Sequence, residues 1–208
     1  MTTQAPDASA RRRSRASLLF ILALFAAPVV LAWLLYYVFP GWIPAATSNH
    51  GELVKPVRKV PDFSLQTVSG KTITAKFLQG KWTFVYLHEG ACEHACVEQL
   101  YKVRQVRLTQ GKNIDRLQRL MLWSPGAVPE AARRELQEHF PGQVIGLLPP
   151  DPQQLIATFG VDGKAALGAE RVYLVDPLGN LMMVYGPADE PRGMIKDLER
   201  LLKYSGLG

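Results

Sequence analysis

The chain contains two cysteines, which are separated by three intervening residues within the stretch 87–96, and His88 and His94 lie beside them. An apolar run at 82–87 precedes the pair and predicts a buried strand, and the segment 97–108 carries apolar residues near helical spacing. We therefore expect the cysteines between the end of a strand and the start of a helix. The first N–H groups of a helix and the positive end of its dipole stabilise a thiolate, which is the form that attacks disulfides and binds soft metals.

Cys92 and Cys96 suit two kinds of chemistry. A disulfide between them would close a small loop and restrict the unfolded chain little, which favours a functional role over a structural one. Two thiolates suit Cu(I), to which His94 or, less favourably, His88 could add a nitrogen; a hydrogen-bonded or surface histidine is the simpler interpretation of both. In thiol–disulfide exchange, Cys92 would attack a partner disulfide, and Cys96 would resolve the mixed disulfide. A structural zinc site and a haem attachment site are disfavoured by the ligand spacing.

The N-terminal region predicts a membrane anchor. Residues 16–39 are an uncharged run of 24 residues, longer than the roughly 20 that cross a bilayer. Four arginines in the basic tail, residues 1–15, precede it. This charge places the tail in the cytoplasm and the rest of the chain on the far, periplasmic side of an inner membrane. A cleaved signal peptide is the alternative, but its apolar region is usually only about 7–15 residues long.

The net charge of +6 does not indicate a nucleic-acid-binding protein. Half of the excess lies in the tail, where four Arg accompany one Asp, and the remaining 20 basic and 17 acidic residues are scattered. A nucleic-acid interface would need basic residues clustered on one face. We therefore expect no nucleic-acid partner.

The rest of the chain divides into a linker, residues 40–59, and a globular domain, residues 60–208. Within the linker, residues 49–54 are expected as a short strand or turn against the domain. Apolar runs and turn residues predict this order of elements: a hairpin at 61–65 and 72–74, a strand at 82–87, a helix at 97–108, a strand at 117–123, a helix at 130–140, a strand at 144–148, a short helix at 152–159, a hairpin at 171–176 and 181–185, and a helix over 194–202.

Strands that alternate with helices and end in an antiparallel hairpin indicate an α/β fold. A cysteine pair after the first long strand makes the layout thioredoxin-like. The predicted fold class is a thioredoxin-like mixed sheet with flanking helices, preceded by a single N-terminal transmembrane helix.

The domain resembles the Sco/SenC group of membrane-anchored, thioredoxin-like proteins that assist copper insertion into cytochrome c oxidase. The resemblance covers most of residues 60–203 and rests on these stretches: Pro61-Asp62-Phe63-Ser64-Leu65, Gly80-Lys81, Cys92-Glu93-His94-Ala95-Cys96, residues 119–123, and Val172-Tyr173-Leu174-Val175-Asp176-Pro177-Leu178-Gly179-Asn180. The cysteine spacing is the most specific feature, because redox thioredoxins have two intervening residues where this chain has three.

The chain departs from the group in two places. The prolines that the group has within and just after the cysteine motif are replaced, here by Glu93-His94-Ala95 and by Val97. The histidine that supplies the third copper ligand in the group has no counterpart in residues 165–171, where Gly168 falls at its place by simple alignment. The resemblance thus implies a divergent Sco-like protein without the distal ligand.

The cysteine pair and the resemblance together leave three functions open. A metallochaperone would handle Cu(I) through Cys92 and Cys96, with His94 as a third ligand, for a cytochrome c oxidase subunit. A thiol–disulfide oxidoreductase would reduce the copper-site cysteines of that subunit, or of another copper or thiol assembly protein, without copper of its own. A docking chaperone would hold an assembly intermediate without chemistry.

Overall fold

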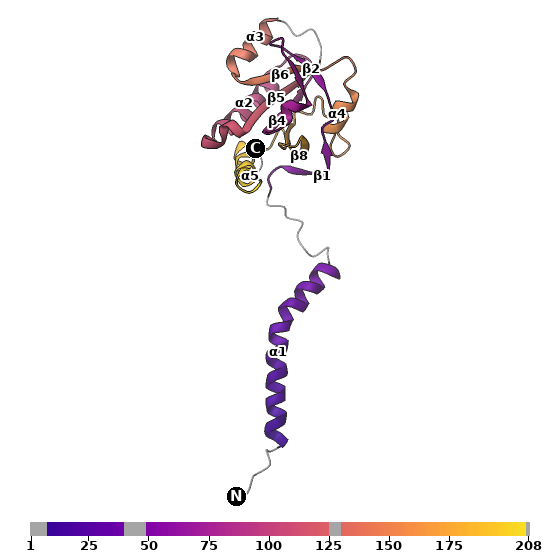
Figure 1. The fold of residues 1–208 in the computed structure, drawn as a ribbon, viewed down its shortest axis with the longest axis vertical. Helices are drawn as coiled ribbons and strands as arrows, with labels where there is room; N and C mark the ends of the chain where they lie inside the picture. The colour runs from indigo at the N-terminus through magenta and orange to yellow at the C-terminus, as the bar shows by residue number, and fades with distance from the viewer. Residues whose placement is uncertain (1–7, 40–48, 125–129, 207–208) are drawn as a thin grey trace. The chain divides into compact units, whose positions relative to one another are not determined.

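Figure 1 shows the computed structural model of the chain, which describes residues 8–39, 49–124 and 130–206. The chain separates into two compact units, residues 1–47 and residues 48–208. The first unit contains helix α1 (Ala8–Tyr37), and the second contains all the described strands and the remaining helices.

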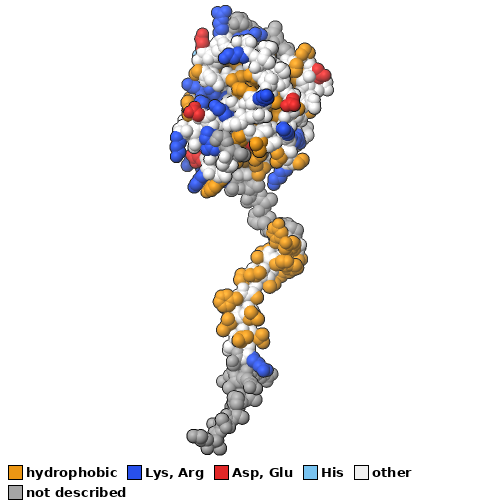
Figure 2. Space-filling view, viewed as in Figure 1, with side chains coloured by type: hydrophobic (Ala, Val, Ile, Leu, Met, Phe, Trp, Pro, Cys, Tyr) orange, Lys and Arg blue, Asp and Glu red, His pale blue; other side chains and the backbone are white. Residues whose placement is uncertain are grey.

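Helix α1 agrees with the predicted anchor helix. Its segment from Arg15 to Tyr37 is long and apolar enough to cross a membrane, and none of its most apolar stretch is buried inside the protein. Figure 2 shows hydrophobic side chains along much of its surface. A helix that is apolar all round and unburied has no core of its own to face, which is typical of a membrane span.

The second unit is built on one mixed sheet of eight strands, in the order β1-β8-β7-β4-β5-β6-β2-β3. The strands are β1 (Glu52–Lys59), β2 (Ser64–Thr67), β3 (Thr72–Thr74), β4 (Trp82–His88), β5 (Leu117–Trp123), β6 (Gln143–Leu147), β7 (Val172–Val175) and β8 (Asn180–Tyr185). Strand β5 pairs in parallel with β4 and with β6, and all other neighbouring pairs are antiparallel. The parallel strands are joined through helices, as such connections require.

Helices cover both faces of this sheet. They are α2 (His94–Leu108), α3 (Glu130–His139), α4 (Gln153–Phe159) and α5 (Pro191–Tyr204), with two 3₁₀ turns, η2 (Ala75–Leu78) and η3 (Gly111–Arg116). Buried residues of α2, α3 and α5 share a core with Phe84 and Tyr86, whereas those of α4 share the opposite core with Val85 and Leu87. Every residue of β4 is therefore buried, and the cysteine loop follows directly after the strand.

The predicted order of strands and helices within the domain is confirmed, as is the thioredoxin-like mixed sheet. The helix predicted at 97–108 begins earlier, at His94, directly after the extended N-cap residue Glu93. Cys96 consequently lies inside α2, whereas Cys92 lies in the loop before it.

The range 40–59, expected as a linker, contains strand β1. Residues 40–48 lie outside the described residues, but 52–59 pair with β8 at the edge of the sheet. The register of this pairing shifts between Leu53 and Arg58, around Pro56. Proline and charged residues are tolerated on an edge strand with a bulge, so this composition fits an edge strand as well as a linker.

Asp197 of α5 binds the backbone of the residues that lead into β1. Its buried carboxylate accepts hydrogen bonds from the backbone N–H groups of His50 (2.9 Å) and Gly51 (2.8 Å) and from the hydroxyl of Tyr185 (3.3 Å). Burial, and then the neighbouring Asp197 carboxylate, raises the pKa of Tyr185 far above its usual range, so the phenol remains a donor. The chain therefore enters the domain at a fixed point on α5.

Candidate functional site

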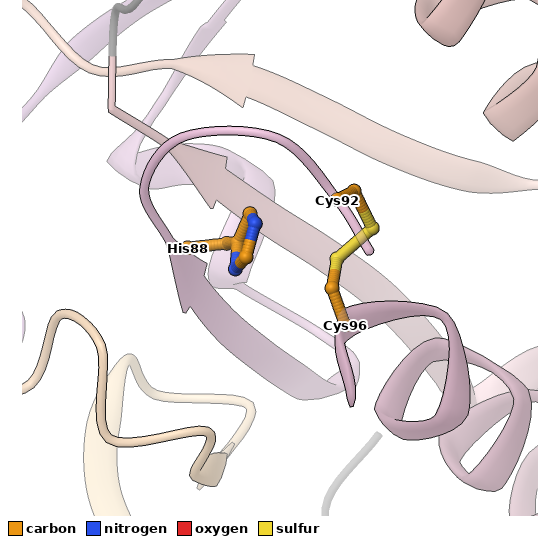
Figure 3. Close-up of side chains that lie close together, drawn as sticks. All are labelled: His88, Cys92 and Cys96. Carbon is orange, nitrogen blue, oxygen red and sulfur yellow. A yellow bond between two sulfur atoms is a disulfide. The ribbon is translucent and has the colours of Figure 1, made fainter. Parts of the chain in front are cut away.

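The two cysteines form a disulfide just beyond the end of β4. Cys92 and Cys96 are bonded, with their Cα atoms 5.1 Å apart. Cys96 is the third residue of α2 and is only 1% exposed, whereas Cys92 is partly exposed. Figure 3 shows the bond running from the loop to the first turn of the helix. Cys92 is thus the member of the pair that a partner can reach.

The N-terminus of α2 favours a thiolate once the disulfide is reduced. The first N–H groups of a helix lack partners within it, and the N-cap residue Glu93 makes no side-chain hydrogen bond to them. The first turn contains no acidic residue. The positive end of the α2 dipole therefore stabilises a thiolate at Cys96. The carboxylates of Glu89 and Glu93 repel a thiolate, but both are exposed, so solvent screens their charge.

His88, the last residue of β4, joins the two cysteines. A ring nitrogen of His88 and the sulfur atoms of Cys92 and Cys96 all lie within 4.8 Å of one another (Figure 3). The histidine is 7% exposed. Its Nε2 lies 3.0 Å from the carbonyl oxygen of Ala91. Because a carbonyl only accepts, Nε2 carries the proton of this hydrogen bond.

Tyr86 and Glu170 lie on the other side of the imidazole, next to Nδ1. Nδ1 of His88 lies 3.4 Å from the hydroxyl of Tyr86 and 3.7 Å from a carboxylate oxygen of Glu170. The Tyr86 hydroxyl donates to the same carboxylate. Burial, and then the hydrogen bond to Glu170, raises the pKa of Tyr86 far above its usual range, so the phenol keeps its proton. Because Nε2 carries the proton and Tyr86 gives its own proton to Glu170, Nδ1 of the neutral imidazole keeps its lone pair.

Aromatic packing fixes the loop around the site. The Tyr86 and His88 rings stack with their centroids 5.8 Å apart, and the Trp123 ring lies 6.4 Å from that of His88. The indole N–H of Trp123 donates to the carbonyl of Gly90 at 2.9 Å. Trp123 is completely buried and is therefore a packing residue of the core.

The model of the family described as "Transmembrane-like, thioredoxin-like, C-terminal domain" matches residues 82–205. The chain belongs to this family. The matched range starts at β4 and includes both cysteines of the thioredoxin-like domain and helix α5. A comparison with curated proteins found no match.

Several solved structures share the fold of this thioredoxin-like domain. Bradyrhizobium japonicum ScoI with copper bound is 22% identical, with 69% of this chain and 99% of that chain covered and a TM-score of 0.50. Yeast Sco1 with copper bound is 20% identical, with 70% and 93% covered and a TM-score of 0.59. BsSco, described with a disulfide switch, is 14% identical, with 71% and 96% covered and a TM-score of 0.55. The Sco/SenC resemblance is thus confirmed for the fold.

The structure brings together two of the three residues predicted to hold a metal. Cys92 and Cys96 are bonded, but His94 is the exposed first residue of α2 and is not in the cluster that the described residues form. The nitrogen near the sulfurs comes from His88 instead. His94 lies between the cysteines in sequence, and its side chain is turned to solvent.

The loop 165–171 lies beside the site and contributes Glu170 to it, two residues after Gly168, which stands at the place of the histidine in the Sco/SenC group. Gly168 has a positive φ of 69°, and a Cβ built there would lie 3.3 Å from a carboxylate oxygen of Glu89. Sequence reasoning missed the role of Glu170 and ranked His88 below His94. The available signal for His88 was its place at the end of a buried strand, next to the cysteine loop.

Proposed function

We propose that this chain is a membrane-anchored protein of copper delivery to cytochrome c oxidase, which holds Cu(I) as cargo on Cys92, Cys96 and His88. The observation that carries the proposal is the convergence of two sulfurs and one imidazole nitrogen within 4.8 Å. Proteins of the same fold, ScoI and Sco1, were solved with copper bound. BsSco belongs to a family of cytochrome c oxidase assembly proteins.

The donor set fits this cargo. Two thiolates and an imidazole are the soft and intermediate ligands that Cu(I) prefers. Metal–sulfur bonds of about 2.3 Å allow two ligands of one ion to lie at most about 4.6 Å apart, so the observed spread requires only a small adjustment. The disulfide must first gain two electrons, because sulfurs bonded to each other offer no thiolate. The hydrogen bond from Nε2–H of His88 to the carbonyl of Ala91 fixes the tautomer of the imidazole, with its proton on Nε2.

An anaerobic Cu(I) titration of the reduced protein tests this function. We expect one bound Cu(I), lost on Cys92→Ser or Cys96→Ser. We expect His88→Asn to weaken binding at least about tenfold, since even outer-shell changes cost 10–100-fold. His94→Asn is the matched control and should bind as the wild type does. Copper binding that survives both serine variants would disprove the cargo site, and a loss with His94→Asn alone would return the nitrogen ligand to His94.

A second candidate function is thiol–disulfide exchange, favoured by the pairing of an accessible Cys92 with a buried Cys96. The Cys92 thiolate attacks a partner disulfide, forms a mixed disulfide, and releases a partner thiolate that takes a proton from water. The Cys96 thiolate then attacks the Cys92 sulfur and releases the second partner thiolate. Two electrons pass to the partner, whose cysteines become free to accept copper.

Copper-free exchange with a peptide disulfide tests the second candidate. Cys96→Ser should trap the mixed disulfide on Cys92, whereas Cys92→Ser should trap none. An equal yield from both variants would contradict the assignment of Cys92 as the attacking residue.

The proposal includes the topology and the partner. The four arginines at the start of α1, which precede its apolar stretch, support an N-terminus in the cytoplasm, a single span in the inner membrane, and a domain in the periplasm. The partner would be an oxidase subunit or another copper or thiol assembly protein. If the Cys92→Ser/Cys96→Ser double variant still supports oxidase assembly in cells, both chemistries are dispensable and the docking-chaperone function replaces them.

A further inference from the structure

A groove of about 290 Å³ opens beside the disulfide, between α2 and α3. Cys92 forms part of its wall. Helix α2 contributes Val97, Tyr101 and Arg104, helix α3 contributes Leu136, and Phe140 follows directly after α3. The described residues of this groove belong to the face of the sheet that α2, α3 and α5 cover. The accessible sulfur-bearing residue of the site therefore lies in an apolar depression.

The α2 wall of this groove is unusually apolar for an exposed helix face. Val97 is 41% exposed and Tyr101 is 54% exposed, and they lie four residues apart, on one side of the helix. Exposed aromatic side chains next to a concave apolar surface are typical of sites where a protein segment binds.

The charges at the groove are unequal along its length. Arg104 lies seven residues beyond Val97, about 10 Å along the helix axis. Arg107 and the buried Arg119 lie near Arg104. Burial, and then the like charges of Arg107 and Arg104, lowers the pKa of Arg119 to about 10. On the opposite wall, Glu135 and His139 are the charged or titratable residues. Positive charge therefore gathers at the end of the α2 wall that is distant from Cys92.

We propose that this groove seats the partner segment whose cysteine exchanges with Cys92, and that this segment is apolar around its cysteine. The inference rests on the proposed function, because the occupant must present a sulfur to Cys92. An extended segment advances about 3.3 Å per residue. An acidic residue about three positions from the partner cysteine would thus reach Arg104.

Trapping with two probe peptides tests this inference. The protein is the full chain in detergent, reduced and carrying Cys96→Ser, so that Cys92 forms stable mixed disulfides. Each probe is a symmetrical disulfide dimer of a short peptide. One peptide has leucine and phenylalanine beside its cysteine and glutamate three positions on, and the other has serine, glycine and lysine in those places. We expect the first to react with Cys92 at least about tenfold faster, which corresponds to about 1.4 kcal/mol of binding.

Variants of the groove make the test specific. Tyr101→Ser should remove most of the preference for the apolar peptide, and Arg104→Ala should slow the glutamate peptide while leaving its glutamine counterpart unchanged. Leu108→Ser is the matched control, because Leu108 is an exposed apolar residue of α2 outside the groove. Equal rates for the two peptides, or equal effects of Tyr101→Ser and Leu108→Ser, would overturn the inference.

Glutathione disulfide separates this inference from the proposed function, because it is too small and polar to need the groove. If it reacts with Cys92 and the two peptides do not differ, exchange stands and the groove inference fails. If it does not react either, exchange fails and the groove inference fails with it. Cu(I) binding of Tyr101→Ser in the chain with both cysteines should equal that of the wild type, since Tyr101 is outside the ligand cluster.

Discussion

Arg119 is a cation buried among apolar residues of the α2–α3 face, and it is 3% exposed. One of its nitrogens donates to the carbonyl of Pro141 at 2.6 Å, whereas Nε and Nη1 have no hydrogen-bond partner in the described part of the protein. Buried polar groups without partners destabilise the folded state by about 1–3 kcal/mol each. The neighbouring Arg104 and Arg107 add like-charge repulsion.

Arg119→Met should therefore stabilise the protein. We expect the free energy of unfolding at pH 7 to rise by about 1–3 kcal/mol, measured by urea unfolding followed by circular dichroism. Arg192→Met, on the exposed surface of α5, should change it by no more than about 0.5 kcal/mol. A loss of stability with Arg119→Met would show that its contact with Pro141 outweighs the cost of burying the charge.

The disulfide itself should stabilise the domain less than a bond that closes a long loop. Its cysteines are four residues apart, and the loop-entropy relation gives about 2 kcal/mol for so small a loop. The Cys92→Ser/Cys96→Ser variant should thus lose about 2 kcal/mol of unfolding free energy and retain the circular dichroism spectrum of the wild type. A variant that does not fold would indicate a structural bond instead of a functional one.

At the scale of elements, the contact between α5 and the chain before β1 leaves no room for extra atoms. A Cβ at Gly193 of α5 would lie 2.7 Å from the Cβ of His50. Alanine is normally favoured over glycine in a helix by about 1 kcal/mol. Here we expect Gly193→Ala to destabilise the protein by about 1–3 kcal/mol, because overpacking displaces His50 from Asp197.

Urea unfolding of Gly193→Ala beside Lys196→Ala measures this effect. Lys196 is exposed on the same helix, so its replacement should change the unfolding free energy by no more than about 0.5 kcal/mol. A stabilised Gly193→Ala would mean that α5 and the entering chain separate easily.

The helices and strands that the sequence predicted are those marked by patterns of neighbouring residues, such as apolar runs and residues that end a helix. Strands β4, β5 and β7 are apolar runs because helices cover both faces of the sheet, and α4 ends at Phe159, as the predicted helix at 152–159 does. Strand β1 was harder to find, because Pro56 and its charged neighbours are tolerated only through pairing at a sheet edge with β8. That pairing joins residues more than a hundred positions apart.

The same distinction applies to the site. The cysteine pair is local in sequence, so its place between strand and helix was predictable. The choice of His88 over His94 depends on where α2 begins and on contacts with Tyr86 and Glu170. Glu170 is 84 residues from Tyr86, and no spacing rule links them.

At the scale of the whole molecule, α1 and the domain are separate compact units. A chain that begins at residue 48 should therefore keep the secondary structure of the domain and its disulfide, and should move from the membrane fraction to the soluble fraction. Cell fractionation, mass spectrometry of the disulfide and circular dichroism check this. A chain from residue 48 that stays with membranes would show that the domain has a membrane contact of its own.

The stability of the domain should depend on residues 50–59, which a chain beginning at residue 60 lacks. A chain that begins at residue 60 lacks β1, whose Val54 is buried, and lacks the two backbone donors that His50 and Gly51 give to Asp197. Because a buried carboxylate that loses its partners costs about 3–5 kcal/mol, we expect this chain to be at least about 3 kcal/mol less stable than the chain from residue 48. Urea unfolding of the two chains compares them directly. Equal stability would mean that β1 and the Asp197 contacts are dispensable, and that the domain proper begins at Val60.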